Sequence, residues 1–554
     1  MIVADAVAHA LKAEGVEFLF AYPVNPLIEA AAKLDIRTVI VRQERIGLHM
    51  ADAIGRLSSG EKIGVFCMQS GPGAENAFGG VAQAYGESSP IVVLPGGYAR
   101  DQAYVQPNFL SALNFRHVTK SCEQLATPDG VAAAMRRAFA AVRNGRPRPA
   151  LLEIPSDLFA AELSGEFHYQ PAPRTRYGPD PAAVAEVAAA LVGAERPVIY
   201  AGQGVHYAKA WEELRTLAEL LGAPVATSLG GKSAFPENHP LALGAGGRAV
   251  SAQLHHFLHA ADVIFGIGCS FTISSFAVAM PKGKTYIHAT LDPADLHKDV
   301  PVDMALVGDA RLTLAALIRA VEELRNESAP AAQSNAQELS QATNQTAQEI
   351  RRHKTDWLKQ WEPKLTSDDT PLSPYRVVWD LLHTVDVANT IITHDAGSPR
   401  DQLSPFWEAL APLSYIGWGK TTQLGYGLGL ALGAKLFAPD KLCINVWGDA
   451  AIGFTGMDFE TAVRERIPIL SILLNNFSMA IEIPIMPVST QKYGATDISG
   501  NYAEMAKAFG GYGERVTTPA EIVPAIRRGI AQTEAGKPAL LEFITAKETE
   551  VSKY

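Results

Sequence analysis

The chain has 554 residues, too many for a single hydrophobic core, and three domains of ordinary size are expected. A formal net charge of −10 argues against nucleic acid and anionic membranes as partners. No apolar run approaches the roughly 20 residues of a membrane span, and the first residues lack the pattern of a signal peptide. Four widely spaced cysteines without a Cys-x-x-Cys motif predict a reduced, cytoplasmic protein without a zinc site.

Strand and helix signals alternate through the first block, to which we assign residues 1–170. Apolar runs at 38–41, 63–68 and 91–94 predict strands, and the amphipathic stretch 46–57 predicts a helix. This alternation indicates an α/β domain with a mainly parallel sheet.

A second α/β block, residues 185–330, follows a linker at 167–181 that is rich in Pro, Arg and Tyr. Its turn Gly202-x-Gly204 lacks the third glycine and the well-placed acidic residue of a dinucleotide-binding fingerprint. A tight Rossmann-like turn is therefore the favoured interpretation, and nucleotide binding is the alternative. The polar segment 327–346 predicts a surface linker that leads into a helix.

The third block, residues 370–554, contains a β-α-β unit. Apolar strands at 442–447 and 469–474 flank a predicted helix, and Asp449 and Asn476 follow the two strands. A right-handed crossover brings these two residues to the same carboxyl edge of a parallel sheet. A carboxylate and an amide oxygen suit a Mg²⁺ ion that keeps positions open for phosphate oxygens and water. The unit therefore predicts a phosphorylated cofactor bound through a metal.

Several motifs follow one another along the chain, of which Gly448-Asp449-Ala450 and Asn475-Asn476 are two, with 27 positions from Asp449 to Asn476. The others are Tyr22-Pro23, Arg42-Gln43-Glu44, Ser70-Gly71-Pro72-Gly73-Ala74-Glu75-Asn76, Gly231-Lys232-Ser233-Ala234-Phe235-Pro236 and Val307-Gly308-Asp309-Ala310. In this order they resemble the thiamine diphosphate enzymes of the acetolactate synthase and 2-oxo acid decarboxylase superfamily. The resemblance covers nearly the whole chain. It implies three Rossmann-like or flavodoxin-like α/β domains with mainly parallel sheets, which are pyrimidine-binding, central and diphosphate-binding.

The resemblance also implies roles for individual residues. Glu44 would hydrogen-bond N1′ of the cofactor's aminopyrimidine and so activate the cofactor. Taken without the other motifs, Glu44 is interpreted as a carboxylate that interacts with the dipole at a helix N-terminus. Asp449, the Asn476 side chain and the Ser478 carbonyl would bind Mg²⁺. Leu424 matches the bulky residue that bends the cofactor into its V shape. Other residues expected at the cofactor are Pro23, Gly73, Asn76, Gly397, Ser398, Gln423, Gly448, Ala450, Ala451 and Met479.

Two polar residues are candidates for catalysis on the substrate. Glu482 lies six positions after Asn476, where simple decarboxylases of the superfamily have an active-site glutamate. Apolar surroundings would raise its pKa, as suits a general acid, and a surface glutamate is the alternative. Gln69 stands where some relatives have a catalytic histidine, and it can only hydrogen-bond. Further candidates for substrate contact are Val24, Asn25, Gln106, Phe109 and Ile481.

The chain departs from the superfamily's pattern at several places, two of which bear on the predicted site. Ala450 replaces a usual glycine, so we expect no left-handed backbone there. Val24 and Asn25 replace the Gly-Gly of acetolactate synthases, which narrows the space above the thiazolium ring.

These motifs predict a thiamine diphosphate- and Mg²⁺-dependent enzyme that decarboxylates a 2-oxo acid and ligates the product to a second carbonyl compound. Simple decarboxylation to an aldehyde and hydrolytic cleavage of a diketone are the alternatives. The resemblance implies that Glu44 acts on a cofactor held by another subunit, so a homodimer is the smallest active unit and a homotetramer is expected. FAD is an alternative ligand that is not expected to be essential. A flavin- or NAD-linked oxidoreductase and a non-catalytic scaffold are rival classes, and the retained Glu44 argues against the scaffold.

Overall fold

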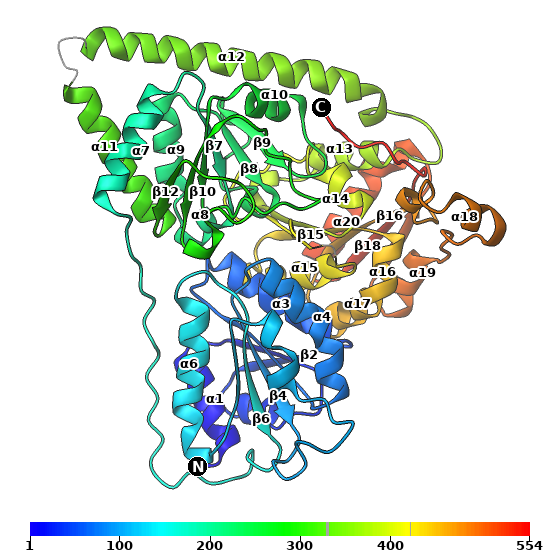
Figure 1. The fold of residues 1–554 in the computed structure, drawn as a ribbon. Helices are drawn as coiled ribbons and strands as arrows, with labels where there is room; N and C mark the ends of the chain where they lie inside the picture. The colour runs from blue at the N-terminus through cyan, green and yellow to red at the C-terminus, as the bar shows by residue number, and fades with distance from the viewer. Residues whose placement is uncertain (328–331, 422) are drawn as a thin grey trace.

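The computed structural model describes residues 1–327, 332–421 and 423–554. The chain forms three α/β domains, each built on a six-stranded sheet (Figure 1). Neighbouring strands in all three sheets run parallel. The predicted fold class is therefore confirmed. Each sheet lies inside one of the three predicted domain ranges, while residue 330, the predicted end of the second range, lies outside the described residues. Within the described ranges no helix combines the length and apolar character needed to cross a bilayer.

The first sheet has the strand order β2-β1-β3-β4-β6-β5. Its strands are β1 (Phe18–Ala21), β2 (Arg37–Ile40), β3 (Gly64–Met68), β4 (Ile91–Gly97), β5 (Ser121–Gln124) and β6 (Ala150–Pro155). Its α-helices are α1 (Val3–Ala13), α2 (Leu27–Ala32), α3 (Glu44–Leu57), α4 (Pro72–Gly86), α5 (Ser111–Asn114) and α6 (Val131–Arg143). The strands and the helix predicted for this block are confirmed, with only small shifts of their ends.

The central sheet has the strand order β12-β11-β10-β7-β8-β9. Its strands are β7 (Val198–Ala201), β8 (Val225–Ser228), β9 (Ala242–Gly246), β10 (Val263–Ile267), β11 (Thr285–Thr290) and β12 (Met304–Val307). Its helices are α7 (Pro181–Gly193), α8 (Gln203–Ala208), α9 (Trp211–Leu221), α10 (Ala252–Ala260) and α11 (Ala310–Glu327).

The glycines of the Gly202-x-Gly204 turn permit a close approach between two loops of the central sheet. A Cβ atom on Gly202 would lie 2.4 Å from the carbonyl oxygen of Gly268, and one on Gly204 would lie 2.7 Å from the Cα atom of Gly268. Any side chain at either position would push the loop after β7 away from the loop after β10. This packing supports the interpretation of the motif as a tight Rossmann-like turn.

The two predicted linkers have different structures. Residues 166–180 form neither helix nor strand before α7 begins, as expected. The surface linker predicted at 327–346 is wrong in its described part, because α11 runs to Glu327 and α12 (Ala332–Leu365) occupies the segment from residue 332 onward. Residues 328–331 of the predicted linker lie outside the described residues. Alanine and glutamine are abundant in this segment and have high helix propensity, which outweighed its low hydrophobicity. Figure 1 shows α12 crossing the central domain toward α13.

The third sheet has the strand order β14-β13-β15-β16-β18-β17. Its strands are β13 (Thr390–His394), β14 (Tyr415–Ile416), β15 (Leu442–Gly448), β16 (Leu470–Asn475), β17 (Tyr512–Val516) and β18 (Ala539–Ile544). Its helices are α13 (Pro374–Thr384), α14 (Ser398–Leu403), α15 (Tyr426–Phe437), α16 (Asp449–Thr455), α17 (Phe459–Arg464), α18 (Pro487–Tyr493), α19 (Tyr502–Ala508) and α20 (Ile522–Glu534). Strands β15 and β16 are parallel neighbours with α16 and α17 between them in sequence, so the predicted β-α-β unit is confirmed.

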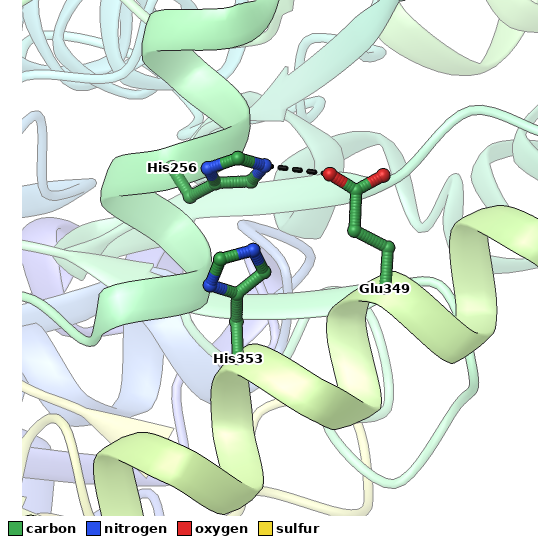
Figure 2. A group of neighbouring side chains, drawn as sticks. All are labelled: His256, Glu349 and His353. Atoms are coloured by element: carbon green, nitrogen blue, oxygen red, sulfur yellow. Dashed lines mark hydrogen bonds and ion pairs between the residues drawn. The ribbon is translucent and has the colours of Figure 1, made fainter.

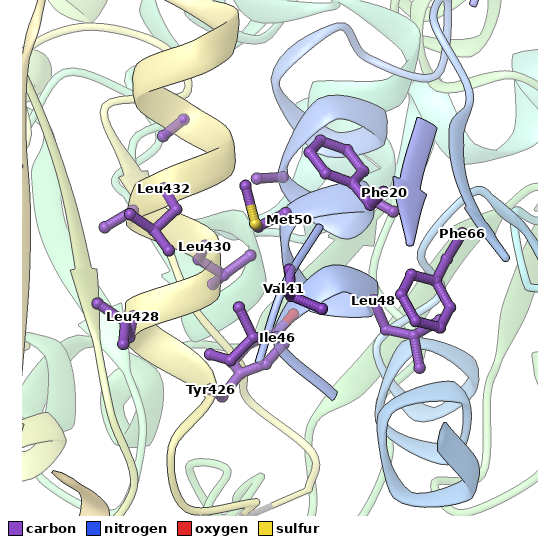
Figure 3. Packing of buried hydrophobic residues seen from close by; sticks show 14 of the residues in the cluster. Phe20, Val41, Ile46, Leu48, Met50, Phe66, Tyr426, Leu428, Leu430 and Leu432 are labelled. Atoms are coloured by element: carbon purple, nitrogen blue, oxygen red, sulfur yellow. The ribbon is translucent and has the colours of Figure 1, made fainter. Parts of the chain in front are cut away.

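The first and third domains share one hydrophobic core, built where α3 meets α15 (Figure 3). Ile46 and Met50 of α3 lie in the same buried cluster as Leu430 of α15. Two glycines of α15 allow the helices to approach closely. A Cβ atom on Gly433 would lie 2.5 Å from the carbonyl oxygen of Met50, and one on Gly429 would lie 2.9 Å from that of Ile46. The helix pair therefore depends on the absence of side chains at these two positions.

A buried carboxylate makes a second connection between the same domains. Glu87, which follows α4, accepts hydrogen bonds from the backbone N–H groups of Gly419 at 3.1 Å, Lys420 at 2.7 Å and Thr421 at 3.1 Å. Its exposed fraction is 2%. Hydrogen bonds to an ionised acceptor are stronger than neutral ones, so one side chain of the first domain shapes a loop of the third.

Candidate active site

Two polar side chains converge at the carboxyl ends of β15 and β16. The backbone N–H of Ser478 donates to Asp449 Oδ2 at 3.0 Å and to Asn476 Oδ1 at 2.9 Å. The shared donor places both oxygens in one crevice, as the β-α-β unit predicts. Burial raises the pKa of Asp449, although N–H groups of Ser478 and Ala450 oppose the shift. Because burial disfavours the charged carboxylate, a cation beside it would be stabilising.

The turn after β16 is connected by hydrogen bonds to the neighbouring strand, β18. Phe477 has a left-handed backbone with φ of 55°, and its N–H donates to Asn475 Oδ1 at 3.0 Å. Asn475 Nδ2 in turn donates to Glu542 Oε1 of β18 at 2.7 Å. Glu542 is fully buried and also accepts from Arg515 Nη2 at 2.9 Å. Sequence reasoning missed Glu542, although a lone glutamate inside an apolar strand was a usable signal.

Asp395, at the end of β13, fixes the turn that carries Leu424. Its Oδ1 accepts from the N–H of Ala396 at 2.7 Å and of Gly425 at 2.9 Å, and its Oδ2 accepts from the N–H of Gly427 at 2.9 Å. Burial raises the pKa of Asp395 to about 6, against the effect of these three donors. Asp395 was not among the predicted site residues, and its position directly after an apolar strand was the available signal.

These elements enclose one cavity in the third domain. With one exception, all the site residues predicted in this domain line it: Gly397, Ser398, Leu424, Gly448, Asp449, Ala450, Ala451, Asn476, Ser478, Met479, Ile481 and Glu482. The exception is Gln423, whose Oε1 lies 3.0 Å from His49 Nε2 of α3. Ala450 lies inside α16, so its backbone is not left-handed, as expected. Gln402 and Thr545 also line the cavity and were not predicted.

Glu482 lies at the edge of this cavity, at the end of a short 3₁₀ turn from Ala480. Burial raises the pKa of its carboxyl group, and the positive charge of Arg248 from the central domain opposes the shift. The guanidinium of Arg248 also lies 3.9 Å from the Asp401 carboxylate. The direction of the Glu482 shift agrees with the expectation for a general acid.

A second group of predicted residues surrounds Glu44 in the first domain. Glu44 begins α3, has an exposed fraction of 2%, and receives a hydrogen bond from the Asn76 side chain. Burial is the largest influence on this carboxyl group and raises its pKa. Gly73 packs directly against Gln69 and Glu44. A Cβ atom on Gly73 would lie 2.8 Å from Gln69 Cγ and 3.5 Å from Glu44 Oε1, so a side chain there would crowd both residues. Glu44, Gln69, Gly73 and Asn76 therefore form one cluster.

The predicted cofactor residue Pro23 and the predicted substrate residues of the first domain are not equally available to a ligand. Pro23, Val24 and Gln106 are exposed, Val24 with an exposed fraction of 73%, and Phe109 is half-buried. Asn25 is buried. Its Nδ2 donates to the carbonyl oxygens of Met68 and Leu94, and its Oδ1 accepts from the N–H of Leu27. The polar atoms of Asn25 are therefore already used inside the domain.

The Glu44 cluster and the third-domain cavity are separate in this chain. Every residue that lines the cavity lies between Pro374 and Ala546. A second cavity of about 320 Å³ lies against the central domain. Glu87 and Arg146 of the first domain, Phe271 and Asp295 of the central domain, and Lys420 of the third are among the residues around it.

The donor set of the third-domain cavity fits a diphosphate held through a divalent cation. Asp449 and Asn476 offer hard oxygen ligands of the kind that Mg²⁺ prefers. The Oγ atom of Ser478 is buried and, among the described residues, has no hydrogen-bond partner. Gly397 and Ser398 lie at the start of α14, where free backbone N–H groups attract anions.

Comparison with known families agrees with this reading of fold and site. Three family models match in order: the thiamine pyrophosphate enzyme N-terminal TPP binding domain over residues 1–126, the central domain over 184–317, and the C-terminal TPP binding domain over 395–543. The chain belongs to the thiamine pyrophosphate enzyme family and is a thiamine diphosphate-dependent enzyme of the acetolactate synthase type.

Its similarity to individual proteins extends over nearly the whole chain. It is 31% identical to a probable acetolactate synthase large subunit of Methanocaldococcus jannaschii and 30% identical to one of Methanococcus aeolicus, in each case over 98% of this chain and 91% of the relative. It is 28% identical to the acetolactate synthase isozyme 3 large subunit of Escherichia coli, over 96% of this chain and 92% of that protein.

Proposed function

We propose that this enzyme decarboxylates a 2-oxo acid and joins the remaining fragment to a second carbonyl compound, using thiamine diphosphate and Mg²⁺. The observation that carries the proposal is the convergence of Asp449 and Asn476 on one backbone N–H, in a cavity that Leu424 also lines. The similarity to acetolactate synthase large subunits supports ligation as the outcome.

Each cluster has a separate task in this proposal. Asp449, the Asn476 side chain and the Ser478 carbonyl hold Mg²⁺ and through it the diphosphate. When bound, thiamine diphosphate supplies the electron sink for breaking a bond next to a carbonyl group. Glu44 hydrogen-bonds N1′ of the pyrimidine, and its raised pKa favours the protonated carboxyl that such a bond needs. Leu424 supports the bent shape of the cofactor.

The smallest active unit in this proposal is a homodimer in which Glu44 of one subunit serves the cavity of the other, and two dimers form a tetramer. The separation of the Glu44 cluster from the cavity supports this arrangement. Exposed apolar side chains on both domains also support it, since large exposed apolar patches mark interfaces. They include Val24, Tyr104 and Val105 on the first domain and Ile485, Val488 and Tyr493 on the third.

Simple decarboxylation to an aldehyde is the second candidate function. Glu482 favours it, because this carboxyl group lines the cavity and burial raises its pKa, so that it holds a proton to higher pH than an ordinary glutamate.

Two further parts of the proposal concern the cellular compartment and a second ligand. The cysteines Cys67, Cys122, Cys269 and Cys443 are free thiols, which supports a reducing, cytoplasmic compartment. FAD remains a non-essential candidate ligand for the cavity of about 320 Å³ beside the central domain.

The test uses purified protein with thiamine diphosphate and Mg²⁺ and a panel of 2-oxo acids, with and without an added aldehyde. Release of carbon dioxide is followed, and products are identified by mass spectrometry. Carbon dioxide with a 2-hydroxy ketone supports carboligation and names both donor and acceptor. Carbon dioxide with free aldehyde alone supports the second candidate, and no carbon dioxide from any acid contradicts both.

A further inference from the structure

Three side chains with metal-binding chemistry meet where α10 and α12 pack together. His256 lies on α10, and Glu349 and His353 lie one turn apart on α12 (Figure 2). The possible ligand atoms of the three residues all lie within 4.8 Å of one another. His256 Nε2 is 2.6 Å from Glu349 Oε1, and the imidazole rings of His256 and His353 stack with centroids 4.0 Å apart. None of the three residues lines either cavity described above.

His353 has a nitrogen without any assigned role in this cluster. Its Nε2 atom is buried and, within the part of the chain that the structure describes, makes no hydrogen bond. Burying a polar atom without a partner is costly. Figure 2 shows the His353 ring facing His256, with Glu349 reaching toward the same space. A cation in this space would give the free nitrogen a partner.

We propose that His256, Glu349 and His353 bind a divalent transition-metal ion of the Zn²⁺ type. Two imidazoles and one carboxylate, with water in a fourth position, form a recognised donor set for Zn²⁺. Mg²⁺ prefers oxygen ligands alone, so this site differs in chemistry from the one at Asp449. Bonds of about 2.0–2.2 Å in a tetrahedral site place ligand atoms about 3.3–3.6 Å apart. The longest separation in the cluster must therefore shorten by roughly 1 Å, while His256 Nε2 and Glu349 Oε1, 2.6 Å apart, must separate by slightly less than that.

The surroundings of the cluster are compatible with metal binding. Arg196 donates to both oxygens of Glu349, at 3.0 and 3.2 Å, which orients the carboxylate and leaves further lone pairs on each oxygen. The side chains of His256 and Glu349 have exposed fractions of 35% and 25%. The ion therefore has a path of entry and room for a bound water.

The metal would fix the connection between two domains. Helix α12 follows the last helix of the central domain and leads into α13 of the third (Figure 1). An ion shared by α10 and α12 would attach this connector to the central domain. Cysteine spacing could not predict the site, because its ligands are imidazoles and a carboxylate brought together by helix packing.

The experiment uses the full-length protein, freed of any histidine tag, stripped with a chelator and loaded with thiamine diphosphate and Mg²⁺. Zn²⁺ is titrated, and the metal retained after desalting is measured by mass spectrometry. The expected result is about one Zn²⁺ per chain and a rise in Tm of several degrees, since a ligand of the native state stabilises it. Co²⁺ should give the visible spectrum of a tetrahedral site with nitrogen and oxygen ligands.

The variants His353→Asn and Glu349→Gln should weaken Zn²⁺ binding at least about 10-fold, as loss of a ligand requires, while their metal-free Tm shows that they fold. His259→Asn is the matched control, because His259 lies on α10 and stacks on His255 with centroids 4.0 Å apart, outside the cluster. It should bind Zn²⁺ like the wild type. The proposal is overturned if the wild type retains no Zn²⁺, or if His353→Asn and Glu349→Gln bind the ion as tightly as the wild type and His259→Asn do.

Discussion

Asp449 and Asn476 accept hydrogen bonds from a single backbone N–H group, that of Ser478, although 27 positions separate them in the sequence. Parallel pairing of β15 with β16 brings them together, because both residues directly follow their strands. One carboxylate and one amide oxygen thus lie side by side, as shared coordination of a cation requires.

Asp449→Asn should weaken Mg²⁺-dependent binding of thiamine diphosphate by about 10- to 100-fold, the usual cost of losing a metal-site contact. The metal-free protein should not lose stability, because burial already disfavours the charged form of Asp449. Calorimetric titration and thermal melts measure the two effects. Asp440→Asn, in the exposed loop before β15, is the control. Equal affinity of both variants for the cofactor would contradict the assignment of Asp449.

Glu44→Gln should lower kcat by at least about 100-fold, as removal of a positioned acid–base group does, and should leave cofactor binding nearly intact. Glu29→Gln, at an exposed position of α2, should behave like the wild type. Steady-state kinetics and calorimetry separate kcat from binding. A Glu44→Gln enzyme of normal kcat would rule out activation of the cofactor by this residue.

Co-expression of Glu44→Gln chains with Asp449→Asn chains tests whether the site is shared between subunits. In a two-fold dimer, half of the dimers are mixed and each mixed dimer has one intact site, so roughly a quarter of the wild-type activity should return. Activity of the co-purified mixture is compared with that of each variant alone. A site formed within one chain would give no recovery.

The fraction of product released as free aldehyde should fall as pH rises through the raised pKa of Glu482, if this group donates the proton. The sign follows from burial, which raises the pKa of the Glu482 carboxyl, so that the acid form persists to higher pH than in an ordinary glutamate and is lost as the pH rises further. Glu482→Gln should remove this pH dependence and lower the aldehyde output. Product ratios from pH 5 to pH 9 show the effect, and Glu504→Gln, exposed on α19, should retain it.

Glu542→Gln should destabilise the protein by about 1–3 kcal/mol, because it leaves Arg515 without its charged partner and weakens the bond to Asn475. The KM for the cofactor should rise as well, since Asn475 holds the N–H of Phe477. Denaturant melts and cofactor titrations report the two changes. A variant that loses stability but binds the cofactor normally would separate Glu542 from the turn it is inferred to position.

Gly433→Ala should cost about 1–3 kcal/mol, the range for overpacked cores, despite the better helix propensity of alanine. Its new Cβ would press on the carbonyl oxygen of Met50. Gly193→Ala, at the end of α7 with no atom within 4 Å of the new Cβ, is the matched control and should be neutral or slightly stabilising. Chemical denaturation compares the two. Equal stabilities would mean that α3 and α15 can separate without cost.

The β-α-β unit and the cavity around it could be predicted because short apolar runs, each ended by a polar residue, locate the ends of parallel strands. Residues that act through strands distant in sequence could not be found this way. Glu542 reaches Asn475 across 67 positions, and a strand order is needed to pair them. Asn25 was predicted to contact the substrate because it is polar and lies near the site in the sequence. The sequence does not reveal that its amide group donates hydrogen bonds to the carbonyl oxygens of Met68 and Leu94 instead.

The connector between the central and third domains was predicted least well. Low hydrophobicity in 327–346 suggested a linker, whereas α12 occupies the segment from Ala332 onward. A polar helix that rests on another domain has no strong apolar period of its own, so composition alone favours the wrong interpretation. The contact of Glu349 with His256 on α10 is likewise visible only after the helices are packed.

The hydrogen bonds of Glu87 limit how this enzyme can be recombined with its relatives. A chimaera that takes residues 370–554 from one parent and residues 1–170 from another replaces the acceptor of the Gly419, Lys420 and Thr421 N–H groups, unless the second parent has a carboxylate at the same place. Truncation to the third domain alone would expose those three donors to water. For engineering, the outer two domains are therefore best exchanged as a pair.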